Sequence, residues 1–486
     1  MEPLRAVLQL LSSDEIVSQF QTLCGLERVP PYENPNYQGD HPSSPKSNKP
    51  PSSPRDAFLK GDKGIDSIFA AVDRESGFES QEDLVERHIR HLNINKKPSN
   101  NSTPNQGDGR IVPKTPSASS PPSPVTGKYP SERTNGTGTA STAPAYRIRY
   151  RLLYYIFRFG SSLGYEAFYA TFFPIWTWNI DGAVCRRVVT MWVLTMYIGQ
   201  VLKDILKLSR PSPKVVIQME PMYVSEYGMP STHAMVGFSV PFSLLYFCGQ
   251  RYDFPFAVGL AICSAWCILI CLSRVYLGMH SVLDIIGGLA LVSVLFAIFL
   301  PFADIADAFM LTSPIAPFVL FVCHIIPSLY YPQTLEEEVA KGQWGPTWAD
   351  TVTILAAGAG ISIGSWLNYQ LGIITAPSLN GTDAILPPPY PIMWPSSQEL
   401  VYCVLRAIVG LACLATVRIA SKTMAYLTVC WYYGKDPSEV KGRNLVKFEL
   451  PVKFITYAAI GLSATFFIPA LFRGFRIARD TMYTEV

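Results

Sequence analysis

Long apolar runs are the feature that most constrains how this chain can fold. Past about residue 163, successive runs approach the roughly 20 apolar residues that a helix needs to cross a bilayer. About nine such runs are present, and the stretch 418–433 is either an extension of the eighth run or an interfacial helix. The runs begin near residues 163, 188, 234, 254, 281, 314, 351, 399 and 453. The sequence therefore predicts an all-α integral membrane protein, a multispan helical bundle of about nine transmembrane helices.

The N-terminal part has the opposite composition. Residues 30–145 are rich in Pro, Ser, Asn, Thr and Gly, so they cannot bury enough apolar surface to offset the entropy of ordering. We expect a disordered Pro/Ser-rich tail there. Residues 1–29 carry apolar side chains at helical spacing, at Leu4, Val7, Leu8 and Leu11. That segment is predicted to form an amphipathic helix, which could anchor on a membrane surface, dock on the protein or be only marginally stable.

Composition argues against several classes of protein. Of the 486 residues, 49% are hydrophobic and 16% are charged, whereas soluble proteins contain about 25% charged residues. The net charge of +3 is too weak to indicate a nucleic-acid partner. The ten cysteines fall mostly in apolar runs, where they behave as small buried hydrophobes rather than as a disulfide framework. Cys263 and Cys267 could share a helix face, but no histidine or carboxylate lies nearby to complete a zinc site.

Three polar clusters stand at the ends of apolar runs, where charge is costly and usually functional. The first is Lys203 with Arg210-Pro211. Their spacing is about two helical turns, so both cations would project from one helix face if the helix continued that far. Pro211 disfavours helix at Arg210, which puts a break near the membrane surface. Two such cations suit an anionic group, although two interfacial side chains reaching for the headgroups would have the same pattern.

The second cluster is Pro230-Ser231-Thr232-His233, just before an apolar run. Ser231 is well placed as a helix N-cap, and the free N–H groups of a helix start attract anions. His233 would lie in the first turn, where it could give a proton to a leaving oxygen. Taken alone, the cluster is better explained as an ordinary capped helix with an interfacial histidine.

The third cluster is Ser273-Arg274 followed by His280 and Asp284. His280 and Asp284 have the spacing that places two side chains on one helix face. A carboxylate that accepts from one ring nitrogen fixes the imidazole tautomer and leaves the other nitrogen nucleophilic. Arg274 adds a planar donor suited to phosphate oxygens. A salt bridge at a helix start beside an unrelated arginine is the simpler alternative for this cluster alone.

The conjunction of the three clusters favours a phosphate site. The second run ends near Arg210, the third begins near His233, the fourth ends near Arg274 and the fifth begins near His280. This alternation brings all three clusters to one side of the membrane. The chain has six histidines. His233 and His280 are the two that lie neither in the tail nor inside an apolar run. The histidine inside an apolar run, His324, is expected to be a buried polar residue rather than a ligand.

The three clusters resemble the three-part signature of the type 2 phosphatidic acid phosphatase (PAP2) superfamily. The matching residues are Lys203-x6-Arg210-Pro211, Pro230-Ser231-x-His233 and Ser273-Arg274-x5-His280-x3-Asp284. The wider stretches 225–235 and 271–281 look like the sphingosine-1-phosphate phosphatases of the endoplasmic reticulum. Thr232 stands where the wider superfamily usually has glycine, and in this respect the chain resembles the sphingoid subgroup.

The resemblance is clearest from about residue 157 to residue 301 and does not cover the tail. It implies that residues 146–305 form a PAP2-type catalytic transmembrane core. Residues 306–486 are then expected to add further transmembrane helices and a C-terminal tail. The implied substrate is a sphingoid base phosphate held in the lipid bilayer, and the implied location is the membrane of the endoplasmic reticulum.

The resemblance also implies roles for the clustered residues. His280 is the implied nucleophile, which forms a phosphohistidine, Asp284 orients it, and His233 is the implied acid and base. The implied phosphate-binding residues are Lys203, Arg210, Ser231, Thr232 and Arg274. No cofactor and no metal are expected.

Other interpretations stay open. A broad-specificity lipid phosphate phosphatase of the phosphatidate type would use the same residues. A non-catalytic multispan lipid-binding scaffold is a different class, and the intact nucleophile, orienting acid and second histidine count against it. Vanadium haloperoxidases have a similar cation-rich pocket but are soluble. A homo-oligomer is compatible with the sequence. Glu166, in the first run, could meet a sphingoid ammonium or pair with a neighbouring span.

Charge and resemblance disagree on the orientation in the membrane. The resemblance implies a lumenal site, whereas four arginines between residues 147 and 158 fall on the side of the site in a nine-span arrangement. The positive-inside rule would then place the site in the cytosol. Three arginines between residues 473 and 479 favour a cytosolic C-terminus on the opposite side. An extra membrane-embedded segment before Leu163 would reconcile a cytosolic tail with a lumenal site.

Overall fold

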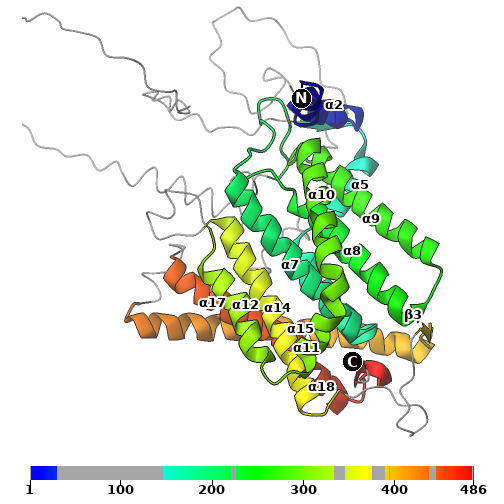
Figure 1. Ribbon diagram of the computed structural model, residues 1–486, viewed down its shortest axis with the longest axis vertical. Coiled ribbons are helices and arrows are strands. Elements are labelled where there is room, and N and C mark those ends of the chain that lie inside the picture. Colours follow the sequence, from blue (N-terminus) through cyan, green and yellow to red (C-terminus); the bar gives the residue numbers. More distant parts are fainter. Residues whose placement is uncertain are drawn as a thin grey trace, which may run out of the picture. The chain divides into compact units, whose positions relative to one another are not determined.

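The computed structural model describes a helical domain and a short N-terminal segment; the predicted tail at 30–145 lies outside the described residues. The described residues are 2–29, 146–220, 223, 226–332, 345–374, 389–392, 394–436, 445–483 and 485. Most of them are helical, and the strands within these ranges form two short pairings (Figure 1).

The N-terminal segment forms two helices instead of the single one expected. These are α1 (Glu2–Leu11) and α2 (Asp14–Leu23), and the break occurs at Ser13, whose side chain caps α2. α2 docks on the helical domain: Val17 is fully buried, and the Gln21 amide donates to the Ile217 carbonyl at 2.7 Å. The chain then forms β1 (Leu26–Arg28), which pairs antiparallel with β2 (Tyr146–Ile148).

Nine helices of the described chain begin near the nine predicted starts. They are α6 (Glu166–Asn179), α7 (Gly182–Leu206), α8 (Thr232–Arg251), α9 (Phe256–Tyr276), α10 (Val282–Phe299), α12 (Ala316–Leu329), α14 (Pro346–Gln370), α15 (Ser397–Tyr433) and α17 (Val446–Leu462). Shorter elements complete the domain: α5 (Arg151–Ser162), β3 (Tyr252–Asp253), η4 (Leu300–Phe302), α11 (Ala303–Thr312), β4 (Tyr390–Pro391), η5 (Ser463–Phe467), α18 (Ile468–Gly474) and η6 (Asp480–Tyr483). β3 and β4 pair in parallel.

The prediction of nine membrane spans is not confirmed. Within the described ranges, six helical stretches are long and apolar enough to cross a membrane: 182–206, 256–276, 282–312, 346–370, 397–433 and 446–474. α6 and α12 have 14 residues each, which is too short, and α8 is less apolar than the six. Counting apolar runs does not by itself give the number of spans, because short helices packed among longer ones are also apolar.

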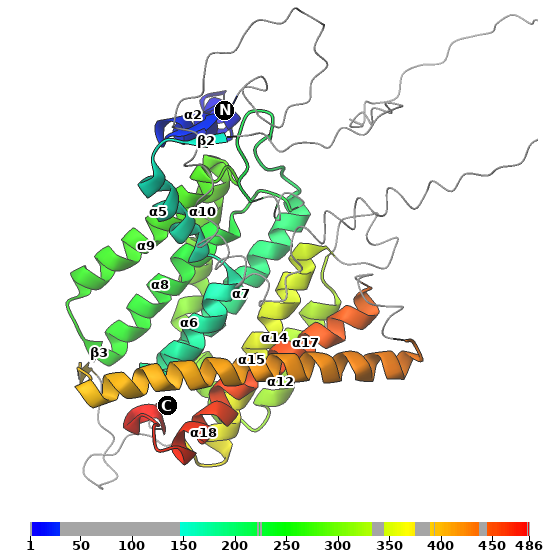
Figure 2. The same cartoon turned by 180° about the vertical axis from the view of Figure 1, so that it is seen from behind.

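The first predicted run, which begins near residue 163, corresponds to α6. This helix begins at Glu166, and the separate helix α5 precedes it. The ambiguous stretch 418–433 is an extension of its predecessor, since α15 continues through it as one helix of 37 residues. α15 runs across the long axis of α7, α8 and α14 in both views (Figures 1 and 2).

The core of the domain surrounds α7. This helix packs against α6, α8, α11 and α14, and it buries Val188, Met191 and Trp192 in one apolar cluster with Val240 of α8 and Ile354 of α14. α7 therefore runs through the centre of the domain, and its two ends lie in different polar surroundings.

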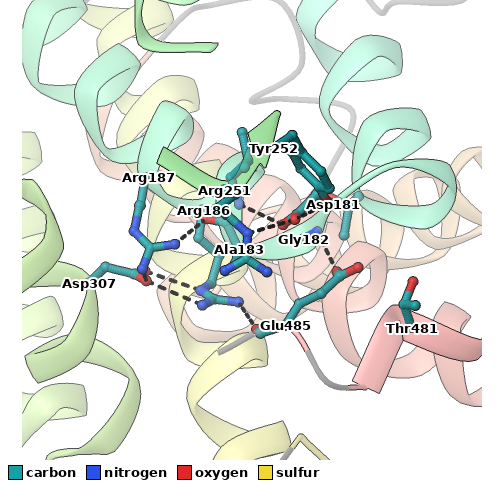
Figure 3. A network of polar contacts seen from close by, with 12 residues as sticks. Asp181, Gly182, Ala183, Arg186, Arg187, Arg251, Tyr252, Asp307, Thr481 and Glu485 are labelled. Carbon is teal, nitrogen blue, oxygen red and sulfur yellow. Dashed lines mark hydrogen bonds and ion pairs between the residues drawn. The ribbon is translucent and has the colours of Figure 1, made fainter. Parts of the chain in front are cut away.

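A network of ion pairs closes the end of the domain at which α7 begins (Figure 3). Asp181 caps α7 and accepts from Arg251 Nε at 2.8 Å. Arg186 forms a two-pronged pair with Asp307 of α11, at 3.1 and 3.2 Å, and donates to the Glu485 carbonyl at 3.2 Å. The network ties the chain's last residues to the start of the central helix.

Candidate active site

The three sequence clusters meet at the other end of the domain. α7 and α9 end there, and α8 and α10 begin there, on the side where α2 docks (Figure 1). Lys203, Ser231, Arg274, His280 and Asp284 are each at most 5% exposed. So many buried charges at helix ends are expensive unless they are paired or bind a ligand.

Lys203 and Arg210 meet on one carboxylate. α7 ends at Leu206, and Lys207 takes a left-handed conformation with φ 53°, so the two cations do not share a helix face as the spacing suggested. Lys203 Nζ instead donates to Glu226 Oε2 at 2.9 Å, and Arg210 Nη2 lies 3.4 Å from the same oxygen. Lys203 Nζ also lies 3.3 Å from Thr232 Oγ1, which ties it to the second cluster.

Arg274 is held by a second carboxylate, Glu220. Its Nη1 donates to Glu220 Oε2 at 2.7 Å and to Ser161 Oγ at 2.7 Å. The phenol of Tyr165 donates to the other oxygen of Glu220, so the arginine is anchored to both α5 and the start of α6. Arg274 Nε is buried and has no hydrogen-bond partner in the described part of the chain.

Sequence reasoning missed Glu220 and Glu226. Burial raises the pKa of the Glu220 carboxyl, but Arg274 and the hydrogen bond from Tyr165 outweigh burial and hold the pKa below its ordinary value. Burial likewise raises the pKa of Glu226, and Lys203 with Arg210 outweighs it in the same way. Both acids are therefore ionised. Both acids lie in the loop between the cluster of Lys203 and Arg210 and the cluster that ends at His233. That position was the sequence signal that could have found them.

His280 lies in the loop between α9 and α10, and each of its two ring nitrogens faces a different side chain. Its Nε2 is 3.1 Å from Arg210 Nη1, and its Nδ1 is 3.8 Å from Asp284 Oδ2. The second distance is too long for a hydrogen bond. Asp284 is held elsewhere, because its Oδ2 accepts from the Ser281 N–H at 2.7 Å in a capping box at the start of α10. Asp284 thus faces His280 as a nearby charge rather than as a direct acceptor.

The surroundings of His280 keep its imidazole neutral. Burial lowers the pKa of His280 well below its ordinary value, and the nearby cations Arg210, Arg274 and Lys203 lower it further. A neutral ring retains the lone pair that a nucleophile needs. Arg210 Nη1 can only donate, so Nε2 is the acceptor and the neutral ring carries its proton on Nδ1, which has no hydrogen-bond partner among the described residues.

His233 lies in the first turn of α8 behind Ser231, whose side chain caps the helix by accepting from the Ala234 N–H at 3.4 Å. The rings of Tyr165 and Tyr223 pack edge-on against it, at 5.6 and 5.9 Å between ring centres. A Cβ on Gly164 would come within 2.4 Å of His233 Cδ2, so only glycine fits there. His233 Nε2 is buried and makes no hydrogen bond to the part of the chain that the structure describes.

The arrangement has the components of phosphoryl transfer through a protein nucleophile. Three cations and a helix N-terminus can hold phosphoryl oxygens. A neutral histidine, His280, lies beside them, and a second histidine presents an unpartnered nitrogen. Every residue predicted for the site is described and lies in this region. His324 is elsewhere, hydrogen-bonded through Nδ1 to the Leu320 carbonyl at 2.9 Å inside α12.

Comparison with known proteins places these residues in a recognised region. Residues 185–304 match the family model of the PAP2 superfamily. The chain is 38% identical over 321 residues to sphingosine-1-phosphate phosphatase 1 of Rattus norvegicus, covering 66% of this chain and 72% of that protein. It is 36% identical over 343 residues to sphingosine-1-phosphate phosphatase 2 of Homo sapiens, covering 70% and 83%. No solved structure gives a significant match.

Proposed function

Since the chain belongs to the sphingosine-1-phosphate phosphatases of the PAP2 superfamily, we propose that it hydrolyses sphingosine 1-phosphate and related sphingoid base phosphates. The products are the free sphingoid base and inorganic phosphate. The observation that carries the proposal is the junction of His280, His233 and three cations with buried side chains at one end of α7 to α10.

In the proposed mechanism, Lys203, Arg210 and Arg274 bind the phosphoryl oxygens, with Ser231 and Thr232 at the start of α8. Charge stabilisation of this kind is usually the largest contribution to catalysis. His280 Nε2 attacks phosphorus and forms an N–P bond as the bond from phosphorus to the ester oxygen breaks. His233 gives its proton to that oxygen, which leaves as the alcohol of the sphingoid base.

The second half returns the enzyme to its starting state. His233 takes a proton from water, and the resulting hydroxide attacks the phosphohistidine, so the N–P bond breaks and phosphate leaves. Asp284 stabilises the positive charge that His280 carries while it is phosphorylated. Arg210 Nη1 lies 3.1 Å from the attacking nitrogen, so the guanidinium must turn toward the phosphoryl oxygens before attack. No residue role in this scheme requires a metal, and metal-independent activity stays a prediction.

The decisive experiment is phosphate release by the purified full chain from sphingosine 1-phosphate in mixed micelles. His280→Ala removes the nucleophile, so we expect release to fall to background. His324→Ala is the matched control, because this histidine lies in α12 away from the site. Wild-type turnover by His280→Ala would refute the mechanism. Radiolabelled substrate should also leave an acid-labile label on the wild type and none on His280→Ala.

A broad-specificity lipid phosphate phosphatase is the second candidate. It is favoured by a 30% identity over 152 residues to the lipid phosphate phosphatase delta of Arabidopsis thaliana, although this covers only 29% of the chain. Equal kcat/KM on phosphatidate and sphingosine 1-phosphate would support it. We place the enzyme in the endoplasmic reticulum membrane with the site facing the lumen, which glycosylation mapping of the sequon at Asn380 and of sequons introduced near the site would test.

A further inference from the structure

The segment that carries Arg210 has no regular secondary structure to hold it. α7 ends at Leu206 and α8 begins at Thr232, and the described residues 207–220 between them form no helix or strand. In such a segment the backbone N–H and C=O groups must find partners elsewhere. The place of Arg210 therefore depends on the partners that other segments supply.

The N-terminal segment supplies several of these partners. Asp14 Oδ2 accepts from the Ser212 N–H at 3.1 Å. The guanidinium of Arg28 donates to three carbonyls between residues 213 and 216, at 2.6, 2.8 and 3.0 Å. All of these bonds go to backbone groups, so side chains of the N-terminal segment help to set the path of the chain just after Arg210.

Gln21 of α2 joins this segment to the turn that precedes His280. Its amide is 1% exposed. Nε2 donates to the Ile217 carbonyl at 2.7 Å and to the Tyr276 carbonyl at 2.8 Å, and Oε1 accepts from the Ile217 N–H at 3.0 Å. Ile217 follows Arg210 in the loop after α7, and Tyr276 is the last residue of α9. One buried amide thus bridges two segments that each carry a site residue.

The two bridged segments are in close contact. The Met219 N–H donates to the Leu277 carbonyl at 3.0 Å. Gly278 has φ 68°, and a Cβ there would come within 2.3 Å of the Ile217 carbonyl oxygen and 2.9 Å of Gln21 Nε2. Only glycine fits this approach.

The contacts of Arg210 lie directly beyond the bridge. Arg210 Nη1 donates to the Met279 carbonyl at 2.8 Å and lies 3.1 Å from His280 Nε2. Met279 and His280 follow Gly278 without a break. The distance between the guanidinium and the histidine therefore depends on how the two segments are held together.

We propose that Gln21 is a positioning residue of the phosphatase site, which, with the N-terminal segment around it, holds Arg210 against the turn that carries His280. The inference rests on the proposed function. Gln21 takes no part in the chemistry and acts through Arg210. It lies outside residues 185–304, the range that matches the PAP2 superfamily. The N-terminal segment is then a working part of the active site as well as a docked pair of helices.

The test measures kcat of the purified full chain on sphingosine 1-phosphate in mixed micelles. Gln21→Met retains an unbranched side chain of similar length but removes the hydrogen bonds to both segments. We expect kcat to fall at least about tenfold, because a small misplacement of an aligned group is costly in rate. Thr22→Ala is the matched control on α2: its hydroxyl donates within the helix, to the Ser18 carbonyl at 3.0 Å, so kcat should stay unchanged.

A double-mutant cycle separates positioning from a general loss of stability. In the Arg210→Gln background, Gln21→Met should lower kcat less than about threefold, because the residue that it positions is already gone. An equal fold-loss in the two backgrounds would overturn the positioning role.

The pH profile gives a second readout that a merely structural role would not change. Arg210 is one of the cations that lower the pKa of His280. A displaced Arg210 lowers that pKa less, so the acid limb of kcat/KM in Gln21→Met should move to higher pH. The other charged or titratable groups that act on His280 are fixed in α7 to α10: Lys203, His233, Arg274 and Asp284. An unmoved limb would contradict the proposal.

The remaining outcomes are also decisive. Unchanged kcat in Gln21→Met would overturn the proposal while leaving the phosphatase assignment intact. If Gln21→Met does not fold, Arg28→Ala at an exposed position is measured instead. Its kcat should fall about threefold in the wild-type background and stay unchanged in Arg210→Gln, and an unchanged kcat in both would overturn the proposal. If the wild type releases no phosphate, or His280→Ala retains activity, the proposed function fails instead.

Discussion

The two ends of α7 both bury charged networks, yet they differ in what the charges contact. At the starting end, Asp181 and Asp307 each accept from an arginine of another element. The Glu485 side chain accepts from Arg479, and its carbonyl accepts from Arg186 of α7. At the other end, the histidines His233 and His280 each keep a buried nitrogen without a partner in the described chain. Buried charge alone therefore does not mark function here. Arg479 Nε at the starting end also lacks a hydrogen-bond partner in the described chain, so the distinguishing feature is the unpaired nitrogens of two histidines, which can give and take protons.

The comparison predicts that the two ends fail in different ways. Removing a charge at the starting end should change stability and leave the chemistry intact. Removing a group at the site end should change the chemistry and leave stability nearly intact. The predictions below follow in order of expected size.

The largest effect is expected for His233→Ala. Loss of a general acid typically costs about 10²- to 10⁴-fold in rate, so kcat on sphingosine 1-phosphate should fall by that factor. The melting temperature should change little, because His233 Nε2 contributes no hydrogen bond within the described residues. A phosphate ester with a phenol leaving group needs less proton donation, so its rate should fall far less. An equal loss on both esters would remove His233 from the role of acid.

The next effect is expected for Asp307→Asn at the starting end. Breaking a buried ion pair by removing one partner costs about 3–5 kcal/mol, and Arg186 and Arg187 would both lose Asp307 as a charge partner. The unfolding midpoint should fall clearly, while kcat per folded molecule stays the same. Asp304→Asn is the matched control: it pairs with Arg187 at 2.8 Å but is 48% exposed, so it should cost at most about 1 kcal/mol. Reduced kcat with unchanged stability in Asp307→Asn would contradict the comparison.

The smallest effect is a shift in pH dependence. Burial and the cations around His280 lower its pKa, so the neutral nucleophile persists as the pH falls below about 6.5, the ordinary value for histidine. The acid limb of kcat/KM, which reports the free enzyme, should therefore lie below that pH. Arg210→Gln removes a cation and should move the limb to higher pH, whereas Arg210→Lys retains the charge and should leave it in place. An acid limb at or above pH 6.5 in the wild type would show that His280 is not held neutral by its surroundings.

The sequence was most informative where chemistry is encoded by residue type and spacing. The positions of Lys203, Ser231, Arg274 and His280 at helix ends followed from the alternation of apolar runs. Ser231 caps α8 as its place before the run predicted. These outcomes depend on local rules, since caps and helix ends are set by the few residues around them.

Other features depend on contacts between distant segments, which a single sequence does not reveal. Lys203 and Arg210 were expected on one helix face, but α7 ends between them and Glu226 brings them together. Asp284 was expected to accept from His280, but the competing bond from the Ser281 N–H holds it. The count of nine membrane spans is not confirmed, and apolarity alone does not give it because apolarity marks burial in protein as well as in lipid. The predicted tail, the nucleophile's covalent intermediate and self-association stay predictions.

The meeting of the site residues at the ends of α7 to α10 has a consequence for kinetics. A reaction centre at helix ends meets the plane where a lipid's headgroup is held by its own acyl chain, which contributes about 0.8 kcal/mol of anchoring per buried CH₂. The substrate then arrives by lateral diffusion in two dimensions, and its relevant concentration is a mole fraction of the surface. Adding inert lipid at constant substrate should slow the enzyme by dilution within the surface, and one product stays in that plane while the other departs into water.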